Sequence, residues 1–126
     1  MATAIVLAAQ RAGRLDPLAA RAGVSHKCLV PIGGAPLIAH VLATLAAAPG
    51  IVAIRVVIER EAFDLLGPVV RAVAGTPVEL VAAADNLADS VGAGAKGAAV
   101  PLLITTADNV LLSTGAVAEM LDCLAN

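Results

Sequence analysis

The sequence predicts an α/β fold in which a mostly parallel sheet lies between two layers of helices. Short apolar runs rich in β-branched residues alternate with helical patterns along the chain, which is typical of a parallel sheet covered by helices. With 126 residues, the chain fits one domain over 1–126 with a single core. Hydrophobic residues make up 60% and charged residues 14%, so a disordered chain is excluded.

Four segments are predicted strands. The first runs from Thr3 to Ala8, and the second, from Ile51 to Ile58, is almost uniformly apolar, as expected of a strand buried on both faces. The third is Val78 to Ala82 and the fourth is Pro101 to Thr106, with proline at or just before the strand start, where a sheet tolerates it. We expect the sheet order 3-2-1-4, with a ligand cleft over strands one and four.

Helical patterns fill the intervals between these strands. The helix after the first strand is predicted to begin at Pro36 and to end before Pro49, while Gly92 to Gly97 is read as a glycine-rich, marginal helix. The last helix is predicted to begin after Ser113, a good N-cap, with Glu119 and Asp122 on its polar face. Its apolar face is expected to consist of Val117, Met120, Leu121 and Leu124.

Charge and composition exclude several classes of protein. The chain has 8 Lys+Arg against 10 Asp+Glu, a net charge of -2, which argues against wrapping nucleic acid. Phe63 is its single aromatic residue, so bases would have no stacking platform. Prolines and glycines break the charge-free stretch Cys28 to Ile54 into pieces shorter than the ~20 apolar residues of a membrane span. We therefore expect a cytoplasmic protein without a span.

The segment from Ala9 to Ala35 is predicted to be a functional loop. It is far longer than the roughly 2–6 residues of an ordinary βα connection. It follows the carboxyl end of the first strand, where open parallel sheets bind ligands. Its four cations are Arg11, Arg14, Arg21 and Lys27. We interpret Arg21 as a solvated charge and the other three, with Gly13, as candidates for binding a phosphate chain.

Two stretches of this segment carry a family resemblance. Residues 7–14, LAAQRAGR, resemble the L-A-A-G-x-G-x-R loop of the MobA-like NTP-transferase family, and residues 26–37, HKCLVPIGGAPL, resemble its P-K-x-L-x-x-x-x-G-x-P-L segment. The resemblance implies a Rossmann-like, nucleotide-diphospho-sugar transferase-like fold, against which this chain is expected to be short at its carboxyl terminus. It also implies transfer of a nucleotidyl group from an NTP to a phosphorylated acceptor, with release of pyrophosphate.

The same resemblance implies roles for individual residues. Either Arg14 or Arg11 would hold the β- and γ-phosphates, and Lys27 would hold the α-phosphate, where charge develops. Asp108, after the fourth strand, looks like the family's metal-binding aspartate and would hold Mg²⁺. The residues expected to line the nucleotide are Leu7, Ala8, Ala9, Gln10, Gly13, Asn86 and Ser90.

Each of these features also has a plainer interpretation. Asp108 fits an Asx turn, and Ser90 fits a helix N-cap as well as a nucleobase contact. Gly92 to Gly97 satisfies the dinucleotide pattern G-x-G-x-x-G, but it does not begin at a strand end. A nucleophile pair of His26 and Cys28 is disfavoured, because the sequence offers no third group to orient a base.

The sequence therefore predicts an NTP-dependent nucleotidyltransferase that uses Mg²⁺, with an NTP and a phosphorylated small molecule as its partners. The alternative is a non-catalytic nucleotide-binding or protein-pairing module derived from such a transferase. The apolar excess of the composition favours this alternative, because an exposed apolar surface would pair the chain with a second copy or with a partner protein.

Overall fold

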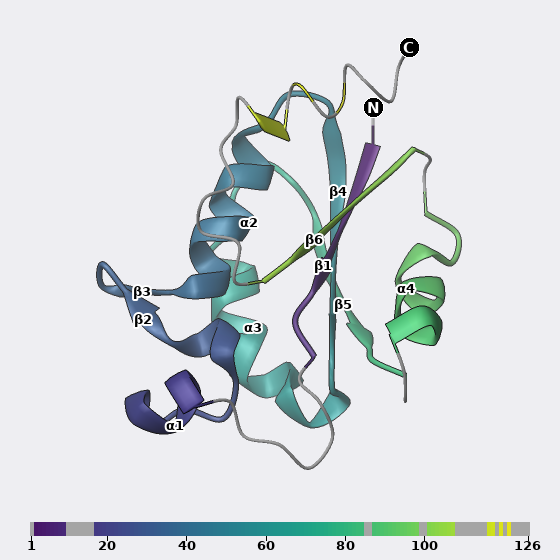
Figure 1. Ribbon diagram of the computed structural model, residues 1–126. Coiled ribbons are helices and arrows are strands. Elements are labelled where there is room, and N and C mark those ends of the chain that lie inside the picture. Colours follow the sequence, from purple (N-terminus) through teal and green to yellow (C-terminus); the bar gives the residue numbers. More distant parts are fainter. Residues whose placement is uncertain are drawn as a thin grey trace.

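The computed structural model describes residues 2–9, 17–84, 87–98 and 101–107, together with residues 116, 117, 119 and 121. Its main sheet has four parallel strands in the order β5-β4-β1-β6, which is the predicted order 3-2-1-4 (Figure 1). The strands are β1 (Ala2–Leu7), β4 (Ile51–Ile58), β5 (Val78–Ala82) and β6 (Leu102–Thr106). All four carboxyl ends therefore lie at one edge of the sheet.

Two of the predicted strands differ from the structure by one residue. Strand β1 begins at Ala2 and ends at Leu7, each one residue earlier than predicted, and β6 begins one residue later than predicted. Residue Pro101 lies just before β6 rather than in it, because proline has no N–H to donate to the ladder. Its carbonyl oxygen accepts a hydrogen bond from Thr3 N at 3.2 Å, which aligns the start of β6 with β1. The bounds of β4 and β5 are those predicted.

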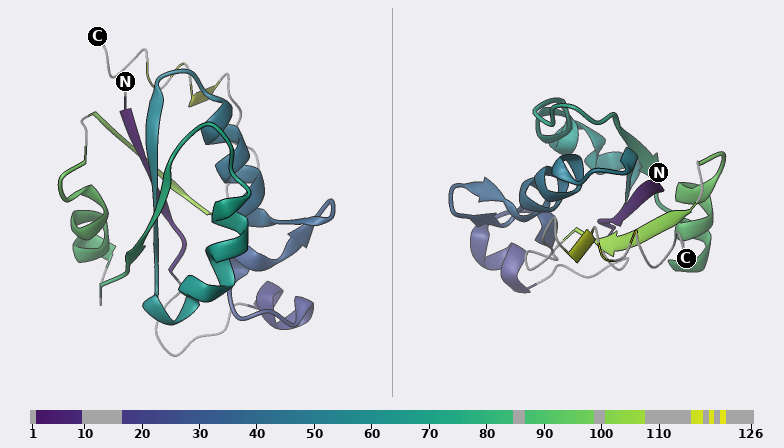
Figure 2. Two further views of the ribbon diagram at one scale, coloured as in Figure 1. Left: turned by 180° about the vertical axis from the view of Figure 1, so that it is seen from behind. Right: turned by 90° about the horizontal axis from the view of Figure 1, so that it is seen from above.

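Helices cover both faces of the sheet, as predicted. The helices α2 (Leu37–Ala47) and α3 (Phe63–Arg71) lie on one face and α4 (Leu87–Ala95) on the other, as Figure 2 shows from above. A short 3-10 helix, η2 (Arg60–Ala62), leads from β4 into α3. No helix among the described residues is long and apolar enough to cross a membrane.

The side chains of β4 alternate between these two faces, as the period of a strand requires. Ile54, Val56 and Ile58 are fully buried in the core formed with α2 and α3. Val57 instead approaches α4, where its Cγ2 atom lies next to Gly94. The sheet is thus buried on both sides, which explains why β4 is almost uniformly apolar.

The prediction that residues 9–35 form a loop is wrong for the part that the structure describes. This part contains the helix α1 (Pro17–Ala22), the 3-10 helix η1 (Lys27–Leu29) and the strand β2 (Pro31–Ile32), which pairs with β3 (Ala35–Pro36). Pro36 consequently ends a strand and is the N-cap of α2 rather than its first residue. In Figure 1, α1 lies towards the edge of the sheet at which β1 ends.

The β2–β3 hairpin turns through two glycines. Gly33 and Gly34 have φ angles of 61° and 86°, the left-handed values that a type I′ turn needs at both central positions. The imidazole Nε2 of His40, on α2, lies 2.6 Å from the carbonyl oxygen of Ile32 and fastens the hairpin to the helix. The Leu37 N–H donates to Val30 O at 2.9 Å, so the end of η1 is joined to the start of α2.

Of the predicted carboxyl-terminal helix, the structure describes residues 116, 117, 119 and 121, which are all in a helical conformation. Val117 is fully buried and Glu119 is exposed, in agreement with the predicted apolar and polar faces. Leu121 packs against the core, and its Cδ1 atom lies near Gly50. The predicted N-cap Ser113 and the predicted core residues Met120 and Leu124 lie outside the described residues.

Arg55 is a charged residue in the middle of β4, and it binds the end of α4. Its guanidinium Nη1 donates to the carbonyl oxygen of Gly94 at 3.0 Å and to that of Lys96. Its Nε lies 3.8 Å from a carboxylate oxygen of Glu79 on the neighbouring strand. The carbonyl groups at the end of a helix accept no intrahelical hydrogen bond, and they lie at the negative end of the helix dipole. The guanidinium cation of Arg55 therefore binds them favourably.

Replacing Arg55 with alanine is expected to lower the free energy of unfolding by about 1–3 kcal/mol, because the carbonyl groups at the end of α4 lose a charged donor. The Glu79→Ala variant is the matched control: its side chain is 70% exposed, so its ion pair with Arg55 contributes at most ~1 kcal/mol. Urea unfolding of both variants measures the difference. Equal losses in the two variants would show that the ion pair, and not the helix end, accounts for the effect.

Candidate functional site

The candidate site begins at the edge of the sheet where the four parallel strands end. Backbone hydrogen bonds continue the ladders past this edge: Ala8 N donates to Val57 O at 2.9 Å, and Ala107 N donates to Leu7 O at 3.0 Å. Ala83 N donates to Ile58 O at 2.9 Å in the same way. The segments that leave the strands therefore start from fixed positions, side by side, where parallel sheets place their ligands.

The first predicted nucleotide-binding residues lie at this edge. Leu7 is half-buried at the end of β1, Ala8 is 7% exposed, and Ala9 is exposed. Because alanine has no polar side-chain atom, these two alanines can offer a ligand only backbone groups and a small apolar contact. Several other predicted site residues lie outside the described residues and stay predictions: Gln10, Arg11, Gly13, Arg14, Asn86 and Asp108.

Lys27, the predicted α-phosphate ligand, is the first residue of η1 and is half-buried. Its carbonyl oxygen accepts a hydrogen bond from Val30 N at 3.1 Å, which closes the single 3-10 turn. The next residue, Cys28, is 3% exposed and packs in the core. The burial of Cys28 thus anchors the backbone next to Lys27 to the core.

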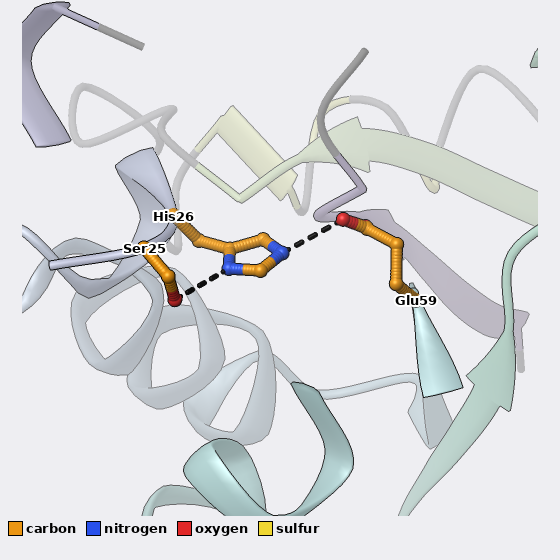
Figure 3. Close-up of polar contacts among 3 residues, drawn as sticks. All are labelled: Ser25, His26 and Glu59. Carbon is orange, nitrogen blue, oxygen red and sulfur yellow. Dashed lines mark hydrogen bonds and ion pairs between the residues drawn. The ribbon is translucent and has the colours of Figure 1, made fainter. Parts of the chain in front are cut away.

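The residue before Lys27 makes a contact that the sequence analysis missed. The Nε2 atom of His26 lies 2.8 Å from Oε2 of Glu59, the residue that follows β4, and its Nδ1 atom lies 2.8 Å from Oγ of Ser25 (Figure 3). The expectation that nothing would orient the His26 imidazole is therefore wrong, because Glu59 does so. Glu59 lies 33 residues further along the chain, and no local pattern relates positions so far apart.

Ser90 lies at the same edge, on α4. Its hydroxyl accepts a hydrogen bond from Ala84 N at 2.9 Å and lies 3.3 Å from Ala84 O, and the residue is 5% exposed. The N-cap interpretation is wrong, because α4 already begins at Leu87 and places Ser90 inside the helix. The hydroxyl instead ties α4 to the segment that leaves β5. Its role as a nucleobase ligand stays a prediction.

The glycine pattern from Gly92 to Gly97 lies within α4 and just beyond it, as the predicted glycine-rich helix required. Gly94 is buried where α4 crosses the sheet, and Gly97 follows the helix with a φ of 68°. A dinucleotide fingerprint would instead occupy the turn between a strand and a helix N-terminus. Of the three glycines, Gly94 therefore serves the packing of α4 against the sheet.

The described residues contain no group of three or more His, Cys, Asp and Glu side chains that could hold a metal ion. Magnesium sites use one or two carboxylates with phosphate oxygens and water, so a protein cage is not required for this ion. Within the described residues, Glu59 follows a strand of the site edge, but one of its carboxylate oxygens is bound to His26.

Comparison with solved structures gives several matches over nearly the whole chain. A nucleotidyl transferase from Methanothermobacter thermautotrophicus is 29% identical, with a TM-score of 0.68 over 97% of this chain and 57% of that one. The 4-diphosphocytidyl-2C-methyl-D-erythritol synthase from Anaerococcus prevotii is 18% identical, with a TM-score of 0.76 over 98% of this chain and 50% of that one. At that identity the match shows a shared fold.

A third structure with the same fold is a CMP:2-keto-3-deoxy-manno-octonic acid synthetase complexed with CTP, which is 18% identical, with a TM-score of 0.71 over 98% of this chain and 47% of that one. The present chain thus spans about half the length of the structures it matches. No curated protein matches the sequence. The family model of the MobA-like NTP transferase domain matches residues 4–126, and the chain belongs to that family.

Proposed function

We propose that this chain forms the NTP-binding part of a nucleotidyltransferase, which moves an NMP group from an NTP to a phosphorylated small-molecule acceptor. The observation that carries the proposal is the match of the family model across residues 4–126. The position of Lys27 on an anchored turn, with its neighbour His26 bound to the residue after β4, supports it. A cytoplasmic location is part of the proposal.

In the proposed reaction, an oxygen of the acceptor phosphate attacks the α-phosphorus of the NTP. The bond from the α-phosphorus to the bridging oxygen breaks, and pyrophosphate leaves with the electron pair of that bond. Protein groups contribute mainly by positioning the reactants and by stabilising the charge that develops on the phosphates. We assign the α-phosphate to Lys27, and the β- and γ-phosphates to Arg14 or Arg11.

Mg²⁺ belongs to the proposal through Asp108, which is the second residue after β6 in the sequence. When bound, the ion would neutralise phosphate charge. The residues proposed to line the nucleotide are Leu7, Ala8, Ala9, Gln10, Gly13, Asn86 and Ser90. Because Ala8 and Ala9 have only small apolar side chains, the base is expected to meet backbone groups and the Ser90 hydroxyl.

Thermal unfolding with CTP, GTP, UTP and ATP, each with and without Mg²⁺, tests the proposed function. A nucleotide that binds the folded chain at 100 times its dissociation constant adds about 2.7 kcal/mol to stability. We expect one nucleotide with Mg²⁺ to raise the unfolding temperature, and Lys27→Ala to remove most of this rise, because the phosphate loses its cation. The Arg21→Ala variant is the matched control, since Arg21 is exposed at the end of α1.

The proposed function fails if none of the four nucleotides changes the unfolding temperature of the wild-type chain. The proposed role of Lys27 fails if Arg21→Ala and Lys27→Ala reduce the nucleotide effect equally, because then only net charge matters. Asp108→Ala should abolish the part of the rise that depends on Mg²⁺. A rise that is equal with and without the ion would remove Asp108 from the proposal.

The second candidate function is a protein-pairing module without catalysis. The observation that favours it is on β6, which pairs only with β1 among the described strands and carries Ile104 with 48% of its surface exposed. An edge strand with an exposed apolar side chain can accept another chain. Pyrophosphate release separates the two candidates, because the pairing module would release none with any NTP and phosphorylated acceptor.

A further inference from the structure

His26 and Glu59 connect two parts of the chain that meet at the candidate site. His26 is the N-cap residue of η1, directly before Lys27, and Glu59 directly follows β4. The side chain of His26 is 9% exposed and that of Glu59 is 29% exposed, so the contact is shielded from most of the solvent. In Figure 3 the imidazole spans the space between η1 and the end of β4.

The hydrogen bonds to His26 fix the orientation of its ring. A carboxylate oxygen accepts hydrogen bonds, so Nε2–H of His26 is the donor and Oε2 of Glu59 the acceptor in this contact. The Nδ1 atom on the other side of the ring is in contact with the Ser25 hydroxyl at 2.8 Å. Because both ring nitrogens have a partner, the imidazole cannot turn without breaking a hydrogen bond.

Backbone hydrogen bonds connect Lys27 and His26 within one turn. Leu29 N donates to His26 O at 3.0 Å and Val30 N donates to Lys27 O at 3.1 Å, so residues 26–30 form one compact turn. A hydrogen bond from Leu37 N to Val30 O joins this turn to the start of α2. The His26–Glu59 contact joins it directly to the strand edge. The contact with Glu59 and the burial of Cys28 in the core together fix the distance of the Lys27 backbone from the ends of the strands.

We infer that His26 and Glu59 are positioning residues that hold Lys27 at the distance from the sheet edge at which its ammonium group meets the triphosphate. The inference rests on the proposed function. A lysine side chain is long and flexible. It binds a phosphate more tightly when its backbone is already in place, because binding then costs less conformational entropy. Positioning of this kind is the main contribution of protein groups to phosphoryl-type transfer.

The test measures the dissociation constant of the nucleotide that stabilises the wild-type chain, in single and double variants. Lys27→Ala and Glu59→Ala should each weaken binding roughly tenfold. The Lys27→Ala/Glu59→Ala double variant should be weaker than Lys27→Ala by no more than about twofold, because Glu59 acts through Lys27. Glu59→Gln, whose amide oxygen still accepts from Nε2–H, should stay within about threefold of the wild type.

Amide hydrogen exchange adds a readout that does not require a nucleotide. Glu59→Ala and His26→Ala should expose the Leu29 and Val30 amides, while the amides of β4 keep their protection. Glu61→Ala is the matched control, because Glu61 is an exposed carboxylate two residues further along the chain. This control should change neither the exchange pattern nor the nucleotide affinity.

Three outcomes would overturn the inference. Nucleotide affinity that Glu59→Ala leaves intact, while Lys27→Ala lowers it, would overturn the inference and leave the proposed function standing. Fully additive losses in the double variant would show that Glu59 acts independently of Lys27. A wild-type chain that binds none of the four nucleotides would overturn the proposed function, and the inference with it.

Discussion

Replacing Leu66 with alanine is expected to lower the free energy of unfolding by about 2–5 kcal/mol. Leu66 lies on α3 with none of its surface exposed, and it belongs to the core between the helices and the sheet. Shortening it removes apolar contacts and leaves a cavity that neighbouring strand residues cannot fill without moving the backbone. The midpoint of urea unfolding measures the loss, provided that the slope of the transition stays unchanged.

Leu65, the residue before Leu66, provides the control for this substitution. Leu65 is 50% exposed, so Leu65→Ala removes the same atoms mainly from contact with solvent. Its effect should stay within roughly 0.5 kcal/mol. Similar losses at both positions would contradict the placement of α3, because they would require both side chains to be buried.

The fold was largely predictable because the burial of each strand leaves an apolar pattern within a short segment of the sequence. β4 is buried on both faces, and this leaves an almost continuous apolar run whose ends the sequence marks with Gly50 and Glu59. The bounds of β5 were equally clear, since Pro77 precedes it. The order of the strands also followed, because short helical connections and parallel pairing leave few alternatives.

The elements that were missed are those whose stability does not come from local sequence. The helix α1 has 6 residues, too few for a helix that is stable in isolation. The strands β2 and β3 have two residues each. Such short elements depend on tertiary contacts, such as the bond between His40 and the Ile32 carbonyl. A loop was therefore the natural prediction.

The candidate site divides in the same way. Lys27, Leu7 and Ala8 could be proposed from the sequence because they lie in two segments that resemble family motifs, and their roles at the site stay predictions. The contact between His26 and Glu59 could not be found, because it joins two loops through side chains that the sequence alone does not bring together. Ser90 was identified, but the Ala84 backbone that it binds was not.

Gly94 sets how closely α4 approaches the sheet, so replacing it is expected to change stability strongly. A Cβ atom built on Gly94 would lie 2.8 Å from Val57 Cγ2 and 3.1 Å from Ile5 Cγ2. Both neighbours are fully buried and branch at Cβ, so their methyl groups cannot swing aside. We expect Gly94→Ala to lower the free energy of unfolding by about 1–3 kcal/mol, since overpacking exceeds the gain in helix propensity.

Gly92, on the same helix, separates these two effects. It is exposed, and no atom lies within 4 Å of a Cβ built there, so Gly92→Ala gains only the helix propensity, up to about 1 kcal/mol. Urea unfolding should therefore give opposite signs at the two positions. Because α4 also carries Ser90, moving it away from the sheet should weaken nucleotide binding in Gly94→Ala but not in Gly92→Ala. Stabilisation by both substitutions would mean that α4 does not pack this closely on β1 and β4.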